Sequence, residues 1–280
     1  MAAAPANSLG RKLIILIGCL LLAIAGFCGL LFVSQHSLIY HPRPYLQSYL
    51  RSLPSKNVTI EYRLDGLAQT AYYIPSKEST PRRLWIAFCG NGSLALDWTY
   101  FLEAYPNPDD AFLLIDYPGY GRNGGYATSK STRESAEIAL HVLAEQLHVT
   151  EGDINLAVIG HSLGAAAALD FAAHHKISRA IIVAPFTTLR EEAARVVGWP
   201  LAYLVRDNYD NRSCLGEILK DQPNCGVTIF HGTEDEVIPV TMGRILAKKY
   251  PRVRFFEVQG AGHDTVMEMA KPEIFAAMTP

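Results

Sequence analysis

A serine at position 162 stands between two glycines in the pentapeptide 160–164, Gly-His-Ser-Leu-Gly. An apolar β-type run over 154–159 precedes it, and an alanine-rich stretch over 165–168 follows it. A strand, a tight turn and a helix in this order hold a serine in a strained backbone conformation, and side chains two residues away on either side would collide. The pattern is typical of a nucleophile elbow, so we expect Ser162 to attack a carbonyl carbon.

Such a serine needs partners, because its hydroxyl is a poor nucleophile at neutral pH without a general base and a group that orients the base. Two later loops offer them. The loop after the seventh β-type run carries three acidic residues, Glu234, Asp235 and Glu236. The loop after the last β-type run presents His263 close to flexible glycines. Each acidic residue is a candidate partner, and His263 is the candidate base.

The elements that must position these residues are short β-type runs that alternate with helical stretches. The runs that predict strands are 58–62, 69–74, 84–88, 111–115, 154–159, 180–183, 227–230 and 254–258. The stretches that predict helices are 96–104, 132–147, 163–173, 240–249 and 264–277. The first two runs indicate an antiparallel hairpin, and the later alternation implies right-handed crossovers. We therefore expect one doubly wound α/β domain over 57–280 with a mostly parallel, eight-stranded sheet.

The segment 186–226 interrupts this alternation, because it has no strand pattern and is long enough to be a small helical lid. It is rich in apolar side chains, namely Val196, Val197, Trp199, Leu201, Tyr203, Leu204 and Val205. These suit an acyl chain or a bilayer, and a helix packed on the domain explains them equally well. Cys214 and Cys225 flank a polar part of the segment, where a disulfide and two free thiols both fit the sequence.

The N-terminal part contains an uncharged apolar run over 13–33, which as an α-helix would extend about 31 Å, the thickness of a bilayer core. The run is longer than the core of a cleaved signal peptide, and no small-x-small cleavage site follows it. We expect a tail over 1–12 and an uncleaved signal anchor over 13–33. Arg11 and Lys12 precede the anchor, so the positive-inside rule places the N-terminus in the cytoplasm and the domain on the extracytoplasmic or lumenal side.

A juxtamembrane linker is predicted over 34–56, where Pro42 and Pro44 should prevent a regular helix. Its tyrosines suit either a membrane interface or packing on the domain surface.

Several other classes of function are excluded by charge and spacing. With 25 Lys and Arg against 27 Asp and Glu, the net charge is −2, which argues against nucleic acid as a partner. The G-x-G-x-x-G pattern at 119–124 lacks both the helix and the later acidic residue of a dinucleotide site. His141, His148, His174 and His175 do not have the spacing of metal ligands. We therefore expect no cofactor and no metal.

The chain resembles α/β-hydrolase-fold serine hydrolases of the membrane-anchored type, which include lysophospholipase-like and protein-depalmitoylase-like members. The resemblance runs from about Leu38 to the C-terminus and rests on the segments 37–42, 116–122, 160–164 and 231–239. The chain order of nucleophile, acid and histidine is also the one typical of α/β-hydrolases.

By this resemblance, Ser162 is the nucleophile, His263 the base and Asp235 the acid. It also implies that the backbone N–H groups of Asn91 and Leu163 form the oxyanion hole. The chain departs from the family at Cys89, where a histidine is common. Only a backbone donor is needed at Asn91, so the departure leaves this chemistry intact.

The implied activity is cleavage of carboxylic ester or thioester bonds of a lipid-like substrate through an acyl-enzyme by a membrane-anchored serine hydrolase. An extracytoplasmic domain favours lysophospholipid or another ester over protein thioesters. The alternative is a non-catalytic, membrane-tethered binding protein that keeps the same fold.

Overall fold

Eight strands form one sheet in the order β1-β2-β4-β3-β5-β6-β7-β8 in the computed structural model, which describes residues 8–52, 57–78 and 80–279. The strands are β1 (Val58–Leu64), β2 (Leu67–Ile74), β3 (Arg83–Phe88), β4 (Asp110–Ile115), β5 (Leu156–His161), β6 (Arg179–Val183), β7 (Gly226–Gly232) and β8 (Arg254–Val258). β2 pairs antiparallel with both β1 and β4, and all the other neighbours are parallel. The predicted mostly parallel, eight-stranded sheet is confirmed.

Local sequence explains why these strands form. Asp65 and Gly66 both have positive φ values, 50° and 79°, as the tight turn of the β1–β2 hairpin requires. Every residue of β3 and β4 is buried, which accounts for their continuous apolar runs. The parallel strands all end at the same edge of the sheet, so the loops after β3, β5, β7 and β8 meet there.

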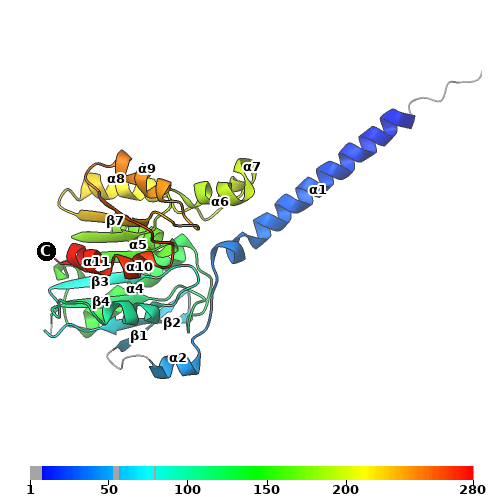
Figure 1. Cartoon of the computed structure of the whole chain (residues 1–280). Helices are drawn as coiled ribbons and strands as arrows, with labels where there is room; N and C mark the ends of the chain where they lie inside the picture. Colours follow the sequence, from blue (N-terminus) through cyan, green and yellow to red (C-terminus); the bar gives the residue numbers. More distant parts are fainter. Residues whose placement is uncertain (1–7, 53–56, 79, 280) are drawn as a thin grey trace, which may run out of the picture.

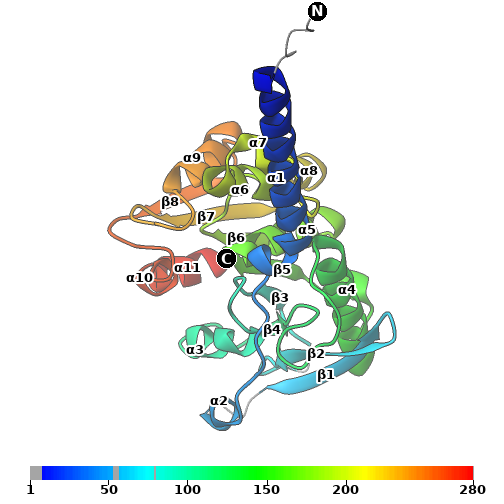
Figure 2. The same ribbon diagram turned by 90° about the vertical axis from the view of Figure 1, so that its right-hand side faces the viewer.

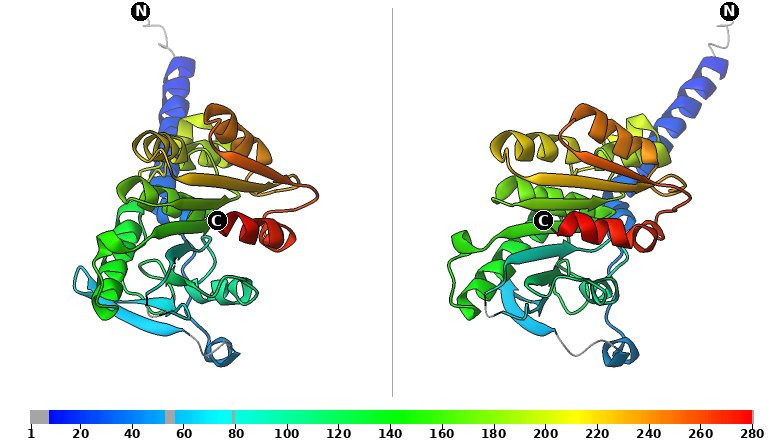
Figure 3. Two further views of the ribbon diagram at one scale, coloured as in Figure 1. Left: turned by 90° about the vertical axis from the view of Figure 1, so that its left-hand side faces the viewer. Right: turned by 60° about the vertical axis from the view of Figure 1, so that its left-hand side comes forward.

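Helices cover both faces of the sheet (Figures 2 and 3). One face carries α4 (Ser129–Gln146), α5 (Leu163–His174) and α8 (Asn211–Asp221). The other carries the 3₁₀ turn Ala95–Asp97, α3 (Trp98–Leu102), α10 (Val266–Met269) and α11 (Lys271–Met278), while α9 (Val240–Lys249) packs against β7 and β8. The predicted last helix over 264–277 is two helices, because Pro272 starts a new one.

The lid is smaller than the predicted segment 186–226. Only α6 (Leu189–Val197) and α7 (Trp199–Ala202) stand away from the sheet (Figure 1). A bridge between Thr188 and Asp210 closes the base of this excursion. α8 instead buries Leu215 and Ile218 and contacts α5, so it belongs to the layer that covers the sheet.

The suggested disulfide between Cys214 and Cys225 is not formed, and both residues are free thiols. Cys214 lies in the first turn of α8, and Cys225 follows the end of that helix. From Cys214 to the last residue of the helix, Asp221, the helix extends about 10 Å, which is beyond the reach of a disulfide.

The N-terminal helix α1 (Ser8–Ile39) projects from the domain (Figure 1). By length and composition alone, Gly10–Ile39 is long and apolar enough to cross a membrane. The helix continues six residues past the predicted end of the anchor, because 34–39 contains neither proline nor glycine.

The region predicted as a linker without regular helix also contains α2 (Gln47–Ser52), since the two prolines restrict only their own neighbourhood. Its end, 53–56, lies outside the described residues, as do residues 1–7 of the predicted tail. The linker tyrosines pack on the domain. The Tyr40 hydroxyl donates to Asp207 at 2.5 Å. The Tyr45 hydroxyl donates to Asp116 at 2.7 Å, and the Tyr49 hydroxyl donates to Asp97 at 2.6 Å.

Candidate active site

Ser162 occupies a sharp turn between β5 and α5, with φ 58° and ψ −122°. This conformation is strained for a residue with a side chain. A Cβ atom on Gly160 would lie 2.0 Å from the Gly164 carbonyl oxygen, and one on Gly164 would lie 2.2 Å from the Phe88 carbonyl oxygen. Both glycines are therefore sterically required, and the local geometry is that of the predicted elbow.

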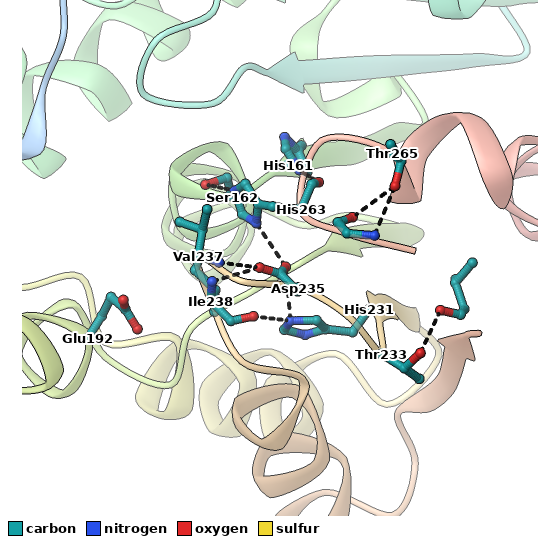
Figure 4. A network of polar contacts seen from close by, with 12 residues as sticks. His161, Ser162, Glu192, His231, Thr233, Asp235, Val237, Ile238, His263 and Thr265 are labelled. Carbon is teal, nitrogen blue, oxygen red and sulfur yellow. Dashed lines mark hydrogen bonds and ion pairs between the residues drawn. The ribbon is translucent and has the colours of Figure 1, made fainter. Parts of the chain in front are cut away.

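Three side chains form one hydrogen-bonded row at this turn (Figure 4). The distance from Ser162 Oγ to His263 Nε2 is 2.9 Å, and the distance from His263 Nδ1 to Asp235 Oδ2 is 2.8 Å. All three residues are buried: Ser162 is 9% exposed, His263 6% and Asp235 9%. The structure thus brings together the three residues that the sequence proposed, from the loops after β5, β7 and β8.

The environment of Asp235 separates it from its acidic neighbours. Glu234 and Glu236 are exposed, whereas Asp235 points inward. Its Oδ1 accepts the backbone N–H groups of Val237 and Ile238 at 3.0 and 2.7 Å. Burial alone raises the pKa of Asp235, but hydrogen bonds from the neighbouring histidines and the Ile238 N–H outweigh it and hold the pKa below the usual range. Asp235 is therefore ionised at neutral pH.

His231 contacts the same carboxylate, a contact that the sequence did not reveal. The fully buried imidazole lies with Nε2 3.4 Å from Asp235 Oδ2 and 2.8 Å from the Ile238 carbonyl oxygen (Figure 4). The sequence signal was weak, because a histidine at the end of an apolar strand fits a structural role equally well.

His161, next to Ser162 in the elbow, contacts the loop that carries His263. Its Nε2 lies 3.0 Å from the His263 carbonyl oxygen, and the two rings are 4.8 Å apart. Burial lowers the pKa of His161 to about 4, so the ring is neutral at neutral pH. Because a carbonyl oxygen only accepts, the neutral tautomer with hydrogen on Nε2 fits this contact.

The loop after β3 brings Asn91 to the site. A Cβ on Gly90 would lie 3.7 Å from the Ser162 Cβ, which shows how closely this loop approaches the serine. Carbonyls on both sides of the Gly90–Asn91 peptide are held: Tyr117 donates to the Cys89 oxygen, and Tyr120 donates to the Asn91 oxygen at 2.6 Å. The loop that carries the predicted Asn91 donor is therefore fixed beside Ser162.

Cys89, the position of the departure from the family, is buried, and its thiol contacts the Ser93 carbonyl oxygen at 3.4 Å. Burial raises its pKa, so the thiol is not ionised at neutral pH.

The G-x-G-x-x-G stretch over 119–124 lies in a loop, and the next helix, α4, begins only at Ser129. Gly121 has φ 59°, and a Cβ there would lie 2.6 Å from Asp116 Oδ2. Close packing against the buried Asp116 accounts for this glycine. Among the described residues, no group of three or more His, Cys, Asp or Glu side chains is arranged to hold a metal ion.

A cavity of about 440 Å³ opens at Ser162, and both Asn91 and Leu163 line it. Most of its other lining side chains are aliphatic, and they come from the lid, from the loop before α9 and from the end of α1. Glu192 is a carboxylate on this wall. It is paired with Arg195 at 2.8 Å, and burial raises its pKa. The cavity is therefore an apolar chamber with the hydroxyl of Ser162 at one side.

Known proteins resemble this chain over much of its length. A model of the alpha/beta hydrolase family matches residues 86–219. An uncharacterized protein of Mycobacterium tuberculosis is 27% identical over 249 residues, which cover 87% of this chain and 85% of that protein. The human alpha/beta hydrolase domain-containing protein 17B is 30% identical over 152 residues, which cover 54% of this chain and 49% of that protein.

Solved structures show the same fold. An esterase of Pyrococcus furiosus superposes with a TM-score of 0.62 at 17% identity, covering 86% of this chain and 97% of the esterase. An alpha-beta hydrolase of Vibrio vulnificus superposes with a TM-score of 0.63 at 16% identity, covering 80% of this chain and 81% of that protein.

Proposed function

Because this chain is an α/β-hydrolase domain protein, we propose that it is a serine hydrolase that cleaves carboxylic ester or thioester bonds of a lipid-like substrate. One observation carries the proposal: the unbroken row from Ser162 Oγ through His263 to Asp235, which opens on an apolar cavity. A serine without a base in reach would not be activated, and here the base and its orienting carboxylate are both at hydrogen-bond distance.

In the proposed mechanism, His263 Nε2 takes the proton of Ser162 as Oγ attacks the acyl carbon, and Asp235 stabilises the imidazolium that forms. The N–H groups of Asn91 and Leu163 donate to the oxyanion. When the tetrahedral intermediate collapses, His263 gives its proton to the leaving oxygen or sulfur, and the acyl group stays on Ser162. A water molecule, deprotonated by His263, then attacks the acyl-enzyme and releases the carboxylic acid.

The volume and the lining of the cavity support a substrate with a lipid-like acyl group. A volume of about 440 Å³ lined mainly by aliphatic side chains suits an alkyl chain better than a polar group. We also propose that α1 anchors the protein in a membrane, with the N-terminus in the cytoplasm and the domain on the other side. In that compartment the substrate is lysophospholipid or another ester. Protection of the domain from added protease in sealed vesicles tests this orientation.

Labelling with a fluorophosphonate tests the serine chemistry. The wild type should label, and Ser162→Ala should not, whereas a matched change at an exposed serine of α8, Ser213→Ala, should label as the wild type does. His263→Gln should leave a folded protein whose ester turnover falls at least ~10³-fold, because the base is lost. Equal labelling of the wild type and Ser162→Ala would instead favour the alternative function, a non-catalytic membrane-tethered binding protein.

A further inference from the structure

The last turns of α1 form one wall of the cavity at Ser162. Four residues of the helix line it: Leu31, Gln35, Leu38 and Ile39. Their spacing of four, seven and eight residues from Leu31 places them on one face of the helix. In Figure 2, α1 runs past α6 and α7 of the lid on its way to the domain. A helix that serves only as a tether has no need to present a continuous face to the active-site cavity.

The lid forms the opposite wall. Apart from Glu192, its lining side chains are aliphatic, among them Leu189, Val196, Val197, Leu201, Leu204 and Val205. Two contacts join this wall to α1. Gln35 Oε1 accepts the backbone N–H of Arg206 at 2.9 Å, and the Arg206 guanidinium lies 5.2 Å from the ring centre of Phe32. The cavity therefore lies between α1 and the lid.

The wall contributed by α1 crosses the end of the uncharged apolar run. Leu31 lies inside the run 13–33, while Leu38 lies beyond it, about 10 Å further along the helix axis. The lid also exposes Val196, Trp199 and Tyr203, at 78%, 53% and 70%. Exposed aromatic residues beside a membrane helix suit the level of the lipid headgroups. If α1 crosses a bilayer, the wall that it contributes to the cavity begins among the acyl chains of the lipids and ends near Ser162.

We propose that α1 is part of the substrate site, and that the acyl chain of a membrane-resident ester enters the cavity from the bilayer along the face of Leu31, Gln35 and Leu38. This inference rests on the proposed function, since it concerns the substrate of the same serine. It makes α1 a determinant of specificity for long acyl chains. The occupant of the cavity is a lipid acyl chain, because the α1 wall of the cavity is continuous with the apolar run that would face lipid.

The test uses the full-length protein in phosphatidylcholine vesicles with two probes, p-nitrophenyl butyrate and p-nitrophenyl palmitate. Leu31→Trp and Leu38→Trp place a larger side chain on the α1 wall and so narrow the cavity. Each should lower the ratio of kcat/KM for palmitate to kcat/KM for butyrate by about tenfold or more relative to the wild type, because the longer acyl chain occupies more of the cavity. The matched control is Val33→Trp, since Val33 is 80% exposed and does not line the cavity. It should leave both substrates unchanged.

Three results would overturn the inference: hydrolysis of butyrate but not palmitate by the wild type, the same palmitate activity in Leu31→Trp, Leu38→Trp and Val33→Trp, or parallel losses on both substrates. A parallel loss would indicate a general structural effect of α1 on the domain. Failure of the proposed function gives a different result, because the wild type would then hydrolyse butyrate no faster than Ser162→Ala.

Discussion

At the scale of single residues, the two glycines around Ser162 have different neighbours. Gly160 faces the Gly164 carbonyl within the turn, whereas Gly164 faces the carbonyls of Phe88 and Cys89 at the end of β3. Gly164 therefore sets how closely α5 approaches the loop that carries Asn91. The position of both predicted oxyanion donors depends on this one contact.

Gly164→Ala should consequently disable the site. A Cβ at 2.2 Å from the Phe88 oxygen must push α5 and β3 apart, so we expect a loss of at least ~2 kcal/mol in stability and of most ester turnover. Thermal unfolding in detergent and ester hydrolysis measure these effects. Gly152→Ala is the control, since a Cβ there meets nothing within 4 Å. Wild-type activity in Gly164→Ala would contradict the steric account of the elbow.

His161 gives the stability a dependence on pH. Its pKa is about 4 in the folded protein and 6.5 ordinarily, so between these values the unfolded chain binds a proton that the folded chain does not. The contribution of His161 to stability is therefore complete above pH 6.5 and is lost as the pH falls towards 4. In His161→Gln, which keeps a donor for the His263 carbonyl, this loss should disappear.

The measurement is the melting temperature of both proteins across this pH range. The comparison must be between variant and wild type, because the buried Asp116 acts in the opposite direction. Burial raises the pKa of Asp116 to about 7, so its contribution falls as the pH rises from 3.8 to 7. Identical pH profiles for His161→Gln and the wild type would exclude His161 as the titrating group.

At the scale of elements, the loop after β3 is held by a residue from the loop after β4. The Tyr120 hydroxyl donates to the Asn91 oxygen at 2.6 Å and accepts the His41 backbone N–H at 2.8 Å. One side chain thus connects the linker to the loop that presents the proposed oxyanion donor.

Tyr120→Phe removes both hydrogen bonds and leaves the ring in place. We expect kcat for an ester to fall about tenfold, less than the loss of an oxyanion donor itself, and stability to fall by about 1–2 kcal/mol. KM should change little, because the acyl cavity is unaltered. Tyr126→Phe is the control, since Tyr126 is 77% exposed. Steady-state kinetics decide the matter, and an unchanged kcat would show that the loop does not need Tyr120.

The elements that the sequence predicted well are those specified by local pattern. Short β-type runs bounded by turn residues, several of them continuously apolar, located all eight strands, and the glycine pattern located the elbow. The lid was overestimated, because the apolar spacing of α8 does not reveal whether it faces the sheet or a cavity. The same limit applies to His231, whose contact with Asp235 depends on how the loop before α9 folds back. The catalytic roles of the site residues remain the proposal that labelling tests.

At the scale of the whole molecule, Asp207 joins three distant parts of the chain. It accepts the Tyr40 hydroxyl from the linker at 2.5 Å, and the Ser129 hydroxyl and N–H from the start of α4 at 2.5 and 3.1 Å. Tyr40 is 2% exposed, so water cannot replace the carboxylate as its partner. The base of α1, the end of the lid and the sheet-covering helices are thus held together at one side chain.

Asp207→Ala should therefore lower stability by about 2 kcal/mol, because a buried hydroxyl loses its partner. When Asp207→Ala is made in the Tyr40→Phe variant, it should lower stability much less, because that variant has no Tyr40 hydroxyl to leave unpaired. Melting temperatures of the four proteins in this cycle measure the coupling. Asp221→Ala is the control at an exposed carboxylate. Additive losses in the double variant would contradict a direct coupling.

Long-range contacts of this kind were not predictable from the sequence. The spacing of apolar residues identified a helix able to span a bilayer, but the whole run is apolar, so no face of it is marked as different. Only the folded lid shows which residues of α1 meet the cavity. The linker tyrosines similarly fitted two environments until Asp207, Asp116 and Asp97 were placed beside them.

The continuity of α1 past residue 33 couples length to rotation. An α-helix gains about 1.5 Å and turns by about 100° with each added residue. Inserting one residue between 34 and 39 would therefore hardly change the distance along the helix axis between the apolar run and Ser162. It would, however, turn Leu31 away from the cavity. Insertions or deletions of three or four residues would restore its direction. The segment can change only in near-whole helical turns if the face towards the lid is to be kept.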